Sequence, residues 1–157
     1  MAEIQVRRAE LGDLEAILDL WQEMMDYHAR LDLRFRSTQN ARSHFRATLK
    51  EWMVDDTQRV FVATDDGRIV GYTIGRIVEN PPIMELRYLG HVSDICVALE
   101  WRRRGIGRML FAALCKWFHR QGLPVVQLSV AARNAISQAF WRKMGFQDYM
   151  HKLWLDI

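Results

Sequence analysis

The chain has 157 residues, half of them apolar, and a formal net charge of +3. This length fits one domain with a substantial buried core, so we expect a single domain over residues 1–157. Charged residues interrupt every apolar run before it reaches the length of a bilayer, and the first residues lack the features of a signal peptide. We therefore predict a cytoplasmic protein without a membrane segment.

Arginine supplies most of the positive charge, a pattern that fits either a solvated surface or an anionic ligand. The two cysteines, Cys96 and Cys115, stand in apolar contexts without the spacing of metal ligands. We predict structural roles for both, no disulfide in a reducing compartment, and no metal site.

The first half of the chain predicts a strand, two helices and a hairpin. Residues 4–8 suit a strand, and Gly12-Asp13 opens a helix whose apolar residues recur at helical spacing as far as Met25. Residues 28–37 are rich in arginine and are expected to form an exposed turn before a second helix, from about Thr38 to Val54. Strands at 60–63 and 68–78 flank the turn Asp65-Asp66-Gly67 and form a hairpin.

The next strand, from Glu85 to Val97, changes phase along its length. Val92 and the apolar residues before it share one parity, whereas Ile95 and Val97 share the other. Because side chains alternate between the two faces of a strand, the change indicates a bulge between Val92 and Ile95, or a strand buried on both faces. The pattern alone leaves both interpretations open.

The second half predicts a helix after Arg102 that Gly122 ends, and a strand over 125–130. Asn134 then caps a helix that runs to Met144, and residues 146–157 are expected to form one or two final strands. The order is β-α-α-β-β-β-α-β-α-β, which indicates an α/β protein with a mixed sheet.

The segment from Arg102 to Gly107 combines features that favour anion binding. A strand ends, a turn follows, and a helix begins whose first N–H groups are unpaired and whose dipole favours negative charge. Gly105 and Gly107 let the backbone approach a bulky anion, and three arginines add positive charge. These features describe a pyrophosphate cradle, although such a run could also be a solvated turn or a nucleic-acid patch. The segment lacks the Lys of a P-loop and the third glycine of a dinucleotide-binding fingerprint.

These residues resemble two motifs of the GNAT N-acetyltransferase superfamily. Arg102, Gly105 and Gly107 fill the fixed positions of its acetyl-CoA signature. A second run is similar to the family pattern that follows, with Asn134, Ser137, Phe140-Trp141 and Gly145-Phe146 in the matching positions. The likeness is strongest from Val92 to Phe146, and the order of elements agrees over nearly the whole chain.

The resemblance implies a GNAT-like acyl-CoA N-acyltransferase fold, a splayed mixed sheet flanked by about four helices, with a bulge near Asp94. It also implies acetyl-CoA as co-substrate, with its pantetheine arm against the backbone of Ile95 and Val97 and its pyrophosphate on the N–H groups of residues 103–108. The residues expected to bind it are Ile95, Cys96, Val97, Arg102, Arg103, Arg104, Gly105, Ile106, Gly107, Arg108, Asn134 and Trp141.

Two positions depart from the family pattern. Trp141 stands where the family often has a tyrosine that protonates the leaving thiolate, and Ser129 stands where many members have a glutamate base. Trp141 is expected to point off the apolar stripe of its helix (Ile136, Ala139, Phe140 and Met144), as a residue that lines the site or an aromatic that covers the domain edge. Asp94 becomes the candidate general base, or alternatively a carboxylate that caps a backbone group or pairs with an arginine. Glu85, Tyr88 and His91 are weaker candidates.

The acceptor site is predicted across from the cofactor, where Tyr27, His28, Asp32 and Arg34 are expected to lie in the turn between the first two helices. The function implied is acetyl transfer to a primary amine of a small metabolite, peptide or protein. A CoA-binding sensor with weak or no catalysis is the alternative, and an arginine-rich nucleic-acid binder is a third interpretation without a recognition motif. Neither a nucleic-acid nor a membrane partner is expected. A homodimer through the apolar stretch Met150 to Ile157 is expected by analogy with the family.

Overall fold

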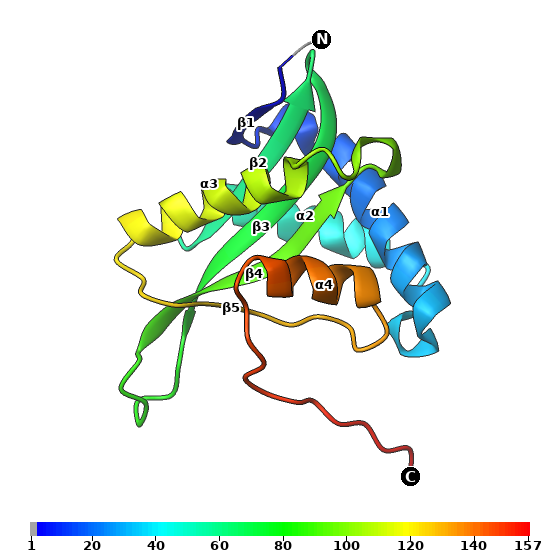
Figure 1. Ribbon diagram of the computed structural model, residues 1–157. Helices are drawn as coiled ribbons and strands as arrows, with labels where there is room; N and C mark the ends of the chain where they lie inside the picture. The colour runs from blue at the N-terminus through cyan, green and yellow to red at the C-terminus, as the bar shows by residue number, and fades with distance from the viewer. Residues whose placement is uncertain (1–2) are drawn as a thin grey trace.

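The computed structural model describes residues 3–157 as a five-stranded mixed sheet with helices on both faces (Figure 1). The strands lie in the order β1-β2-β3-β4-β5, and only β4 and β5 are parallel. The predicted mixed, GNAT-like sheet with four α-helices is confirmed. The strands are β1 (Gln5–Arg8), β2 (Gln58–Asp65), β3 (Arg68–Glu79), β4 (Tyr88–Val97) and β5 (Val126–Leu128). The helices are α1 (Leu14–Leu31), α2 (Ala41–Val54), α3 (Ile106–Arg120) and α4 (Ala135–Lys143), with short 3-10 turns at Leu11–Asp13, Leu33–Phe35 and Leu99–Trp101.

Two layers of helices enclose the sheet. The apolar stripe of α1 packs with α2 on one face, around the fully buried Tyr72 and Ile74 of β3. On the other face α3 buries the predicted stripe, including Leu110 and Leu114, and α4 lies beside it (Figure 1). The β2–β3 hairpin turns at Asp66 and Gly67, both with positive φ, as the Asp-Gly pair predicts.

The predicted bulge in β4 is confirmed, and it lies at Ser93. Ile74 of β3 pairs with Asp94, but the next residue, Gly75, pairs with Val92, so Ser93 has no partner across the ladder. The buried hydroxyl of Thr73 donates a hydrogen bond to the Asp94 carbonyl oxygen at 2.8 Å. This bond stabilises the extra residue and the local kink that a bulge introduces.

Beyond the bulge, β4 and β5 part. β5 pairs only with Gly90, His91 and Val92, although β4 continues to Val97. Ala98 donates its N–H to the carbonyl oxygen of Val70 in β3. Because backbone N–H and C=O groups point to alternate sides along a strand, those of Ile95 and Val97 point away from β3, to the opposite edge of β4. That edge therefore has no strand beside it. This is the splay that the family resemblance implies.

Several predicted boundaries are wrong. α1 continues through Leu31, so residues 28–31 are helical and not part of a turn; the N–H of Asp32 bonds to the His28 carbonyl and closes the helix there. α2 begins at Ala41, not Thr38. The 3-10 turn at Leu99–Trp101 was not predicted.

The final strands expected over residues 146–157 are absent from this segment. The tail is extended, carries no ladder pairing, and leaves the body below α4 (Figure 1). A strand is stable only when it pairs with a neighbour, and the tail pairs with no strand of the described chain. Among residues 3–157, no helix is both long and apolar enough to cross a membrane.

Candidate active site

The turn between β4 and α3, which was predicted to cradle a pyrophosphate, leads into a helix start without a side-chain cap. Gly105 precedes α3 with φ of 81°, a conformation that favours glycine, and no side chain caps the helix. The N–H groups of Ile106, Gly107 and Arg108 therefore have no acceptor within the helix. A Cβ added at Gly107 would lie 3.2 Å from the Phe140 ring of α4, so the glycine permits the close approach of the two helices.

The arginines of this turn are exposed and shape the loop. Arg102 donates from Nε to the carbonyl oxygen of Val97 at 3.0 Å, on the open edge of β4. Arg104 stacks on Trp101, with 4.7 Å from its guanidinium carbon to the ring centroid, and donates to the carbonyl of Glu100. Arg103 has a positive φ of 66°, which turns the chain toward the helix. With Arg108 on the first helical turn, they give this end of α3 a positive field.

Ile95 and Val97 lie on the open edge as predicted, but Cys96 does not. The backbone of Cys96 pairs with Tyr72 on the closed side, and its thiol donates to the Leu20 carbonyl of α1. Burial raises the pKa of this thiol to about 12, so it stays protonated and inert. These contacts support the structural role predicted for Cys96. Neither its backbone groups nor its thiol lie on the open edge with Ile95 and Val97, so we do not assign it to the cofactor site.

Asp94 follows the bulge and directs its carboxyl group to the face of the sheet that α1 covers. The buried Tyr72 hydroxyl donates to Asp94 Oδ2 at 3.2 Å. Burial raises the pKa of Asp94 to about 6, although the Tyr72 hydrogen bond and the nearby His28 lower it. Tyr72 itself has a pKa well above its usual value, because it is fully buried and faces this carboxylate, so it remains a donor. A carboxylate of this kind is ionised at neutral pH yet basic enough to accept a proton.

Asn134 and His28 join α4 to α1 across the open side of the sheet. The Asn134 side-chain oxygen accepts the Ser137 N–H, which confirms the predicted helix cap. Its amide nitrogen then faces His28 Nε2 at 3.2 Å, while His28 Nδ1 lies 2.9 Å from the carbonyl oxygen of Met24. Because a carbonyl oxygen only accepts, His28 donates from Nδ1 to Met24. His28 is thus a helical residue held by two hydrogen bonds.

The remaining residues predicted for the acceptor site do not share one turn. Tyr27 lies on the last turns of α1 beside Arg30. Asp32 is buried and accepts hydrogen bonds from the backbone and guanidinium of Arg34, which lower its pKa to about 2. Arg34 in turn stacks on Trp154 of the tail, 5.7 Å from the ring centroid. Asp32 and Arg34 therefore satisfy each other, and their arrangement is explained by local structure.

The orientation predicted for Trp141 is wrong. Its side chain is only 5% exposed and packs edge-on against Phe111 of α3, Phe140 and Phe146, with centroids between 4.8 and 5.3 Å apart. Ile136, which was assigned to the apolar stripe, is 69% exposed. The bond between Asn134 and His28 fixes the rotation of α4 so that the Asn134–Trp141 face turns inward, because residues seven apart lie on the same side of a helix.

Sequence reasoning missed Tyr72 and Thr73, which orient the Asp94 side chain and backbone. Both lie in β3, where the continuous apolar run concealed their roles. A Thr and a Tyr within such a run are signals, because a fully buried hydroxyl requires a partner. Among residues 3–157, no group of three or more His, Cys, Asp or Glu side chains is placed to hold a metal ion.

Comparison with known proteins agrees with this geometry. Residues 16–146 match the model of the acetyltransferase (GNAT) family. MJ1530, an uncharacterized N-acetyltransferase of Methanocaldococcus jannaschii, is 30% identical over 89 residues, which are 56% of this chain and 52% of that protein. The chain spans about half to two thirds of the length of the first curated relatives that it matches, from 52% to 65%.

Two solved structures share the fold. A mutant of the BH1408 protein from Bacillus halodurans superposes with a TM-score of 0.86 at 23% identity, over 98% of this chain and 99% of that one. An aminoglycoside N-acetyltransferase, AAC(6')-Iy, determined in complex with CoA, superposes with a TM-score of 0.79 at 19% identity, over 100% of this chain and 96% of that one.

We predict that Asn134→Ala destabilises the protein by about 1–2 kcal/mol, because it removes both the cap of α4 and the contact with His28. Asn134→Ser keeps a capping oxygen but cannot reach His28, so this variant should lose less stability than Asn134→Ala. The free energy of unfolding in urea measures both. An Asn134→Ala protein as stable as the original would show that this link does not hold α4 in place.

Proposed function

Because the chain belongs to the GNAT acetyltransferase family, we propose that it transfers the acetyl group of acetyl-CoA to a primary amine of a small metabolite or a peptide. One observation carries this proposal. The unpaired edge of β4 beyond its bulge lies next to the uncapped start of α3, so one extended ligand with an anionic end can meet both. The amide-rich pantetheine arm and the pyrophosphate of acetyl-CoA have this combination of groups.

The chain's own groups fit that co-substrate. We assign the arm to the backbone of Ile95 and Val97, and the pyrophosphate to the N–H groups that open α3. The exposed guanidinium groups of Arg103, Arg104 and Arg108 add attraction for the phosphates. Asn134 and Trp141 contribute indirectly, since one caps α4 and the other packs it on α3. The residues proposed to contact acetyl-CoA are Ile95, Val97, Arg102, Arg103, Arg104, Gly105, Ile106, Gly107 and Arg108.

Acetyl-CoA supplies an activated thioester, and the protein's task is to place the amine and remove a proton from it. The amine nitrogen forms a bond to the carbonyl carbon, the carbon–sulfur bond breaks, and the sulfur leaves with its electron pair. The proton of the attacking nitrogen passes to the Asp94 carboxylate. A buried carboxylate with a pKa of about 6 then returns the proton to water at neutral pH. Tyr72 keeps the carboxylate oriented between turnovers.

The alternative is a CoA-binding protein with little or no catalysis. Two positions favour it: Ser129 has no basic group, and Trp141 is a buried aromatic without an acidic hydroxyl. Thiolate is a tolerable leaving group that water can protonate, so the transferase remains the stronger proposal. The acceptor enters from the C-terminal end of α1, where we place Tyr27 and His28 beside it.

The proposed cofactor site predicts that Gly105→Glu weakens acetyl-CoA binding at least about hundredfold. The substitution places a negative charge in the cradle and a side chain at a positive φ. Gly67→Glu is a matched control, because Gly67 also has a positive φ of 80° with open space around it, but lies in the distant β2–β3 turn. Isothermal titration of both variants measures the effect. Equal affinities would contradict the assignment of the cradle.

The proposed base predicts that Asp94→Asn lowers kcat/KM by about a hundredfold or more while acetyl-CoA still binds. In the original protein kcat/KM should rise with pH through about 6, as Asp94 ionises, and the variant should lack this limb. The pKa of Asp94 is raised by folding, so the fold favours the protonated form and loses stability as pH rises from about 4 to 6. Asp94→Asn should remove that loss. An unchanged pH–rate profile would exclude Asp94 as the base.

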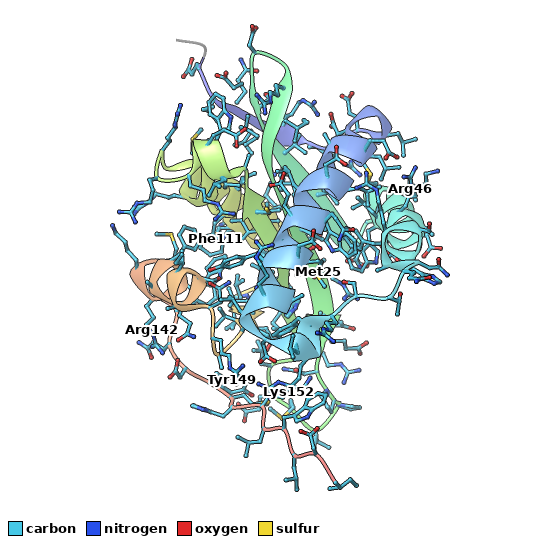
Figure 2. All side chains as sticks on the ribbon, turned by 90° about the vertical axis from the view of Figure 1, so that its right-hand side faces the viewer. Met25, Arg46, Phe111, Arg142, Tyr149 and Lys152 are labelled. Carbon is cyan, nitrogen blue, oxygen red and sulfur yellow. The ribbon has the colours of Figure 1, made fainter. Side chains whose placement is uncertain are left out.

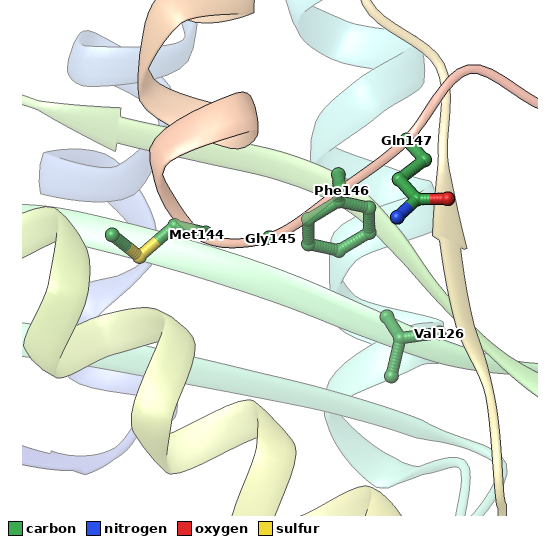
Figure 3. Close-up of a pocket in the computed structure, with 5 residues that line it drawn as sticks. All are labelled: Val126, Met144, Gly145, Phe146 and Gln147. Carbon is green, nitrogen blue, oxygen red and sulfur yellow. The ribbon is translucent and has the colours of Figure 1, made fainter.

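We also propose that the chain forms a homodimer through its tail. The apolar residues Tyr149, Met150, Leu153, Leu155 and Ile157 are each at least 76% exposed. Tyr149 and Lys152 lie on the tail, which runs beyond the end of α1 (Figure 2). β5 is an edge strand, and a hollow of about 350 Å³ lies beside its Val126, between Met144 and Gln147 (Figure 3). A second copy's tail would cover this edge and bury its own apolar side chains.

Light scattering after gel filtration tests this proposal. The intact chain should elute as a dimer, and removal of residues 149–157 should give a monomer that still binds acetyl-CoA. A monomeric intact chain at high concentration would contradict the dimer without affecting the proposed activity.

A further inference from the structure

A row of three polar side chains crosses the sheet next to Asp94. In the strand register Gln58 of β2 lies opposite Arg76 of β3, and Arg76 lies opposite His91 of β4. Residues directly opposite each other share a face of the sheet. Ile74, two residues before Arg76, packs under α1 and pairs with Asp94, so the polar row lies on the same face as the Asp94 carboxyl group. The face that is apolar at Val60 and Ile74 therefore becomes polar one row further.

Arg76 is held in this row without a counter-ion. Its guanidinium carbon lies 4.9 Å from the ring centroid of Trp52 on α2. Its Nε is buried with no hydrogen-bond partner, as is Oε1 of the buried Gln58. The ion pairs within residues 3–157 engage other arginines, all with carboxylates. Asp55 is close enough for Arg76 to contribute to its low pKa, but Asp55 accepts its hydrogen bonds from Thr57.

This arrangement requires an explanation, because a half-buried cation with an unsatisfied donor costs free energy unless an anion reaches it. His91 cannot serve, since burial and the adjacent Arg76 lower its pKa and favour its neutral form. Stacking on Trp52 fixes the orientation of the planar guanidinium. A fixed, unpaired guanidinium is the group that proteins use to bind a carboxylate or a phosphate with two hydrogen bonds.

The strand register places Arg76 one row away from the proposed base. Asp94 lies opposite Ile74, and Ile74 and Arg76 are two residues apart on the same face of β3, about 6.6 Å along the strand. A small acceptor that carries both an amine and an anionic group could span these two positions.

We propose that Arg76, supported by Trp52 and Gln58, binds an anionic group of the acceptor, so that the acceptors are small primary amines that also carry a carboxylate or a phosphate. This inference rests on the proposed acetyl transfer at Asp94. It assigns to the chain a specificity residue, Arg76, that comes from the middle of β3 and not from the loops between the helices.

Matched probes test the charge that the acceptor must carry. 5-Aminopentanoate and 3-aminopropyl phosphate each place an anion five bonds from the amine, whereas 5-amino-1-pentanol is neutral and 1,5-diaminopentane is cationic. With protein saturated in acetyl-CoA, thiol release should give a kcat/KM at least tenfold higher for an anionic probe than for the other two. The better of the two anionic probes distinguishes carboxylate from phosphate. Equal or higher values for the neutral or cationic probe would overturn the inference.

Arg76→Gln should reduce that preference to about one, mainly through KM. Arg59→Gln is the matched control, because Arg59 also stacks on a tryptophan, Trp117, and has an unpartnered Nε, but its neighbours place it on the face that α3 covers. It should leave the preference unchanged. Arg76→Gln could also act by destabilising the protein, which a lower unfolding midpoint than that of Arg59→Gln would reveal. In that case Arg76→Lys is the test. It keeps the positive charge but cannot form two hydrogen bonds to one anion, so it should still reduce the preference. A preference that survives both substitutions at Arg76 would refute the role of this residue.

Direct titration of the CoA-loaded protein with the anionic probes separates this inference from the proposed activity. If an anionic probe binds to the original protein but not to Arg76→Gln, the inference is supported. If such a probe binds but is not acetylated, the proposed acetyl transfer is contradicted and the role of Arg76 in binding is not. No binding of either anionic probe to a protein that binds acetyl-CoA normally would overturn the inference and leave the cofactor site intact.

Discussion

The bulge at Ser93 is the constraint on which the rest of the site depends. One extra residue in β4 ends its pairing with β5 at Val92, and from there the two strands separate. A strand edge inside a protein normally finds a neighbour, because buried N–H and C=O groups require partners. Here the edge at Ile95 and Val97 stays open beside the start of α3. The acetyl-CoA that we propose to bind here would supply the missing hydrogen bonds.

The same bulge sets the direction of Asp94. Without the bulge, side chains would alternate without interruption along β4, and Asp94 would lie on the face opposite to His91 and the row at Arg76. The hydroxyls of Thr73 and Tyr72, both fully buried, hold the backbone and the carboxyl group of Asp94 respectively. The low dielectric of that position raises the carboxyl pKa toward neutrality. One local irregularity thus produces both an open strand edge and a carboxylate next to it whose pKa is raised.

Much of this arrangement follows from the sequence because its signals are local. The phase change around Ser93 predicts the bulge, the glycines after Arg102 predict the cradle, and Asn134 predicts a helix cap. Features that depend on tertiary contacts were not predictable. Asn134 and His28 are 106 residues apart in the chain, and their contact places the Asn134–Trp141 face of α4 toward the interior. Strands are expected over residues 146–157, but a strand forms only by pairing, and the tail pairs with no other strand of the described chain. The isolation of Arg76 emerges only when three strands are placed in register.

Amide NMR spectra of the protein titrated with acetyl-CoA test the central claim most directly, because they report on the backbone groups that the open edge leaves unpaired. The account predicts that the amide signals of Ile95, Val97, Ile106, Gly107 and Arg108 shift and become protected from hydrogen exchange, while those of β1 and the β2–β3 turn remain unchanged. Saturable binding that leaves these five amides unaffected, or that perturbs a different surface, would contradict it.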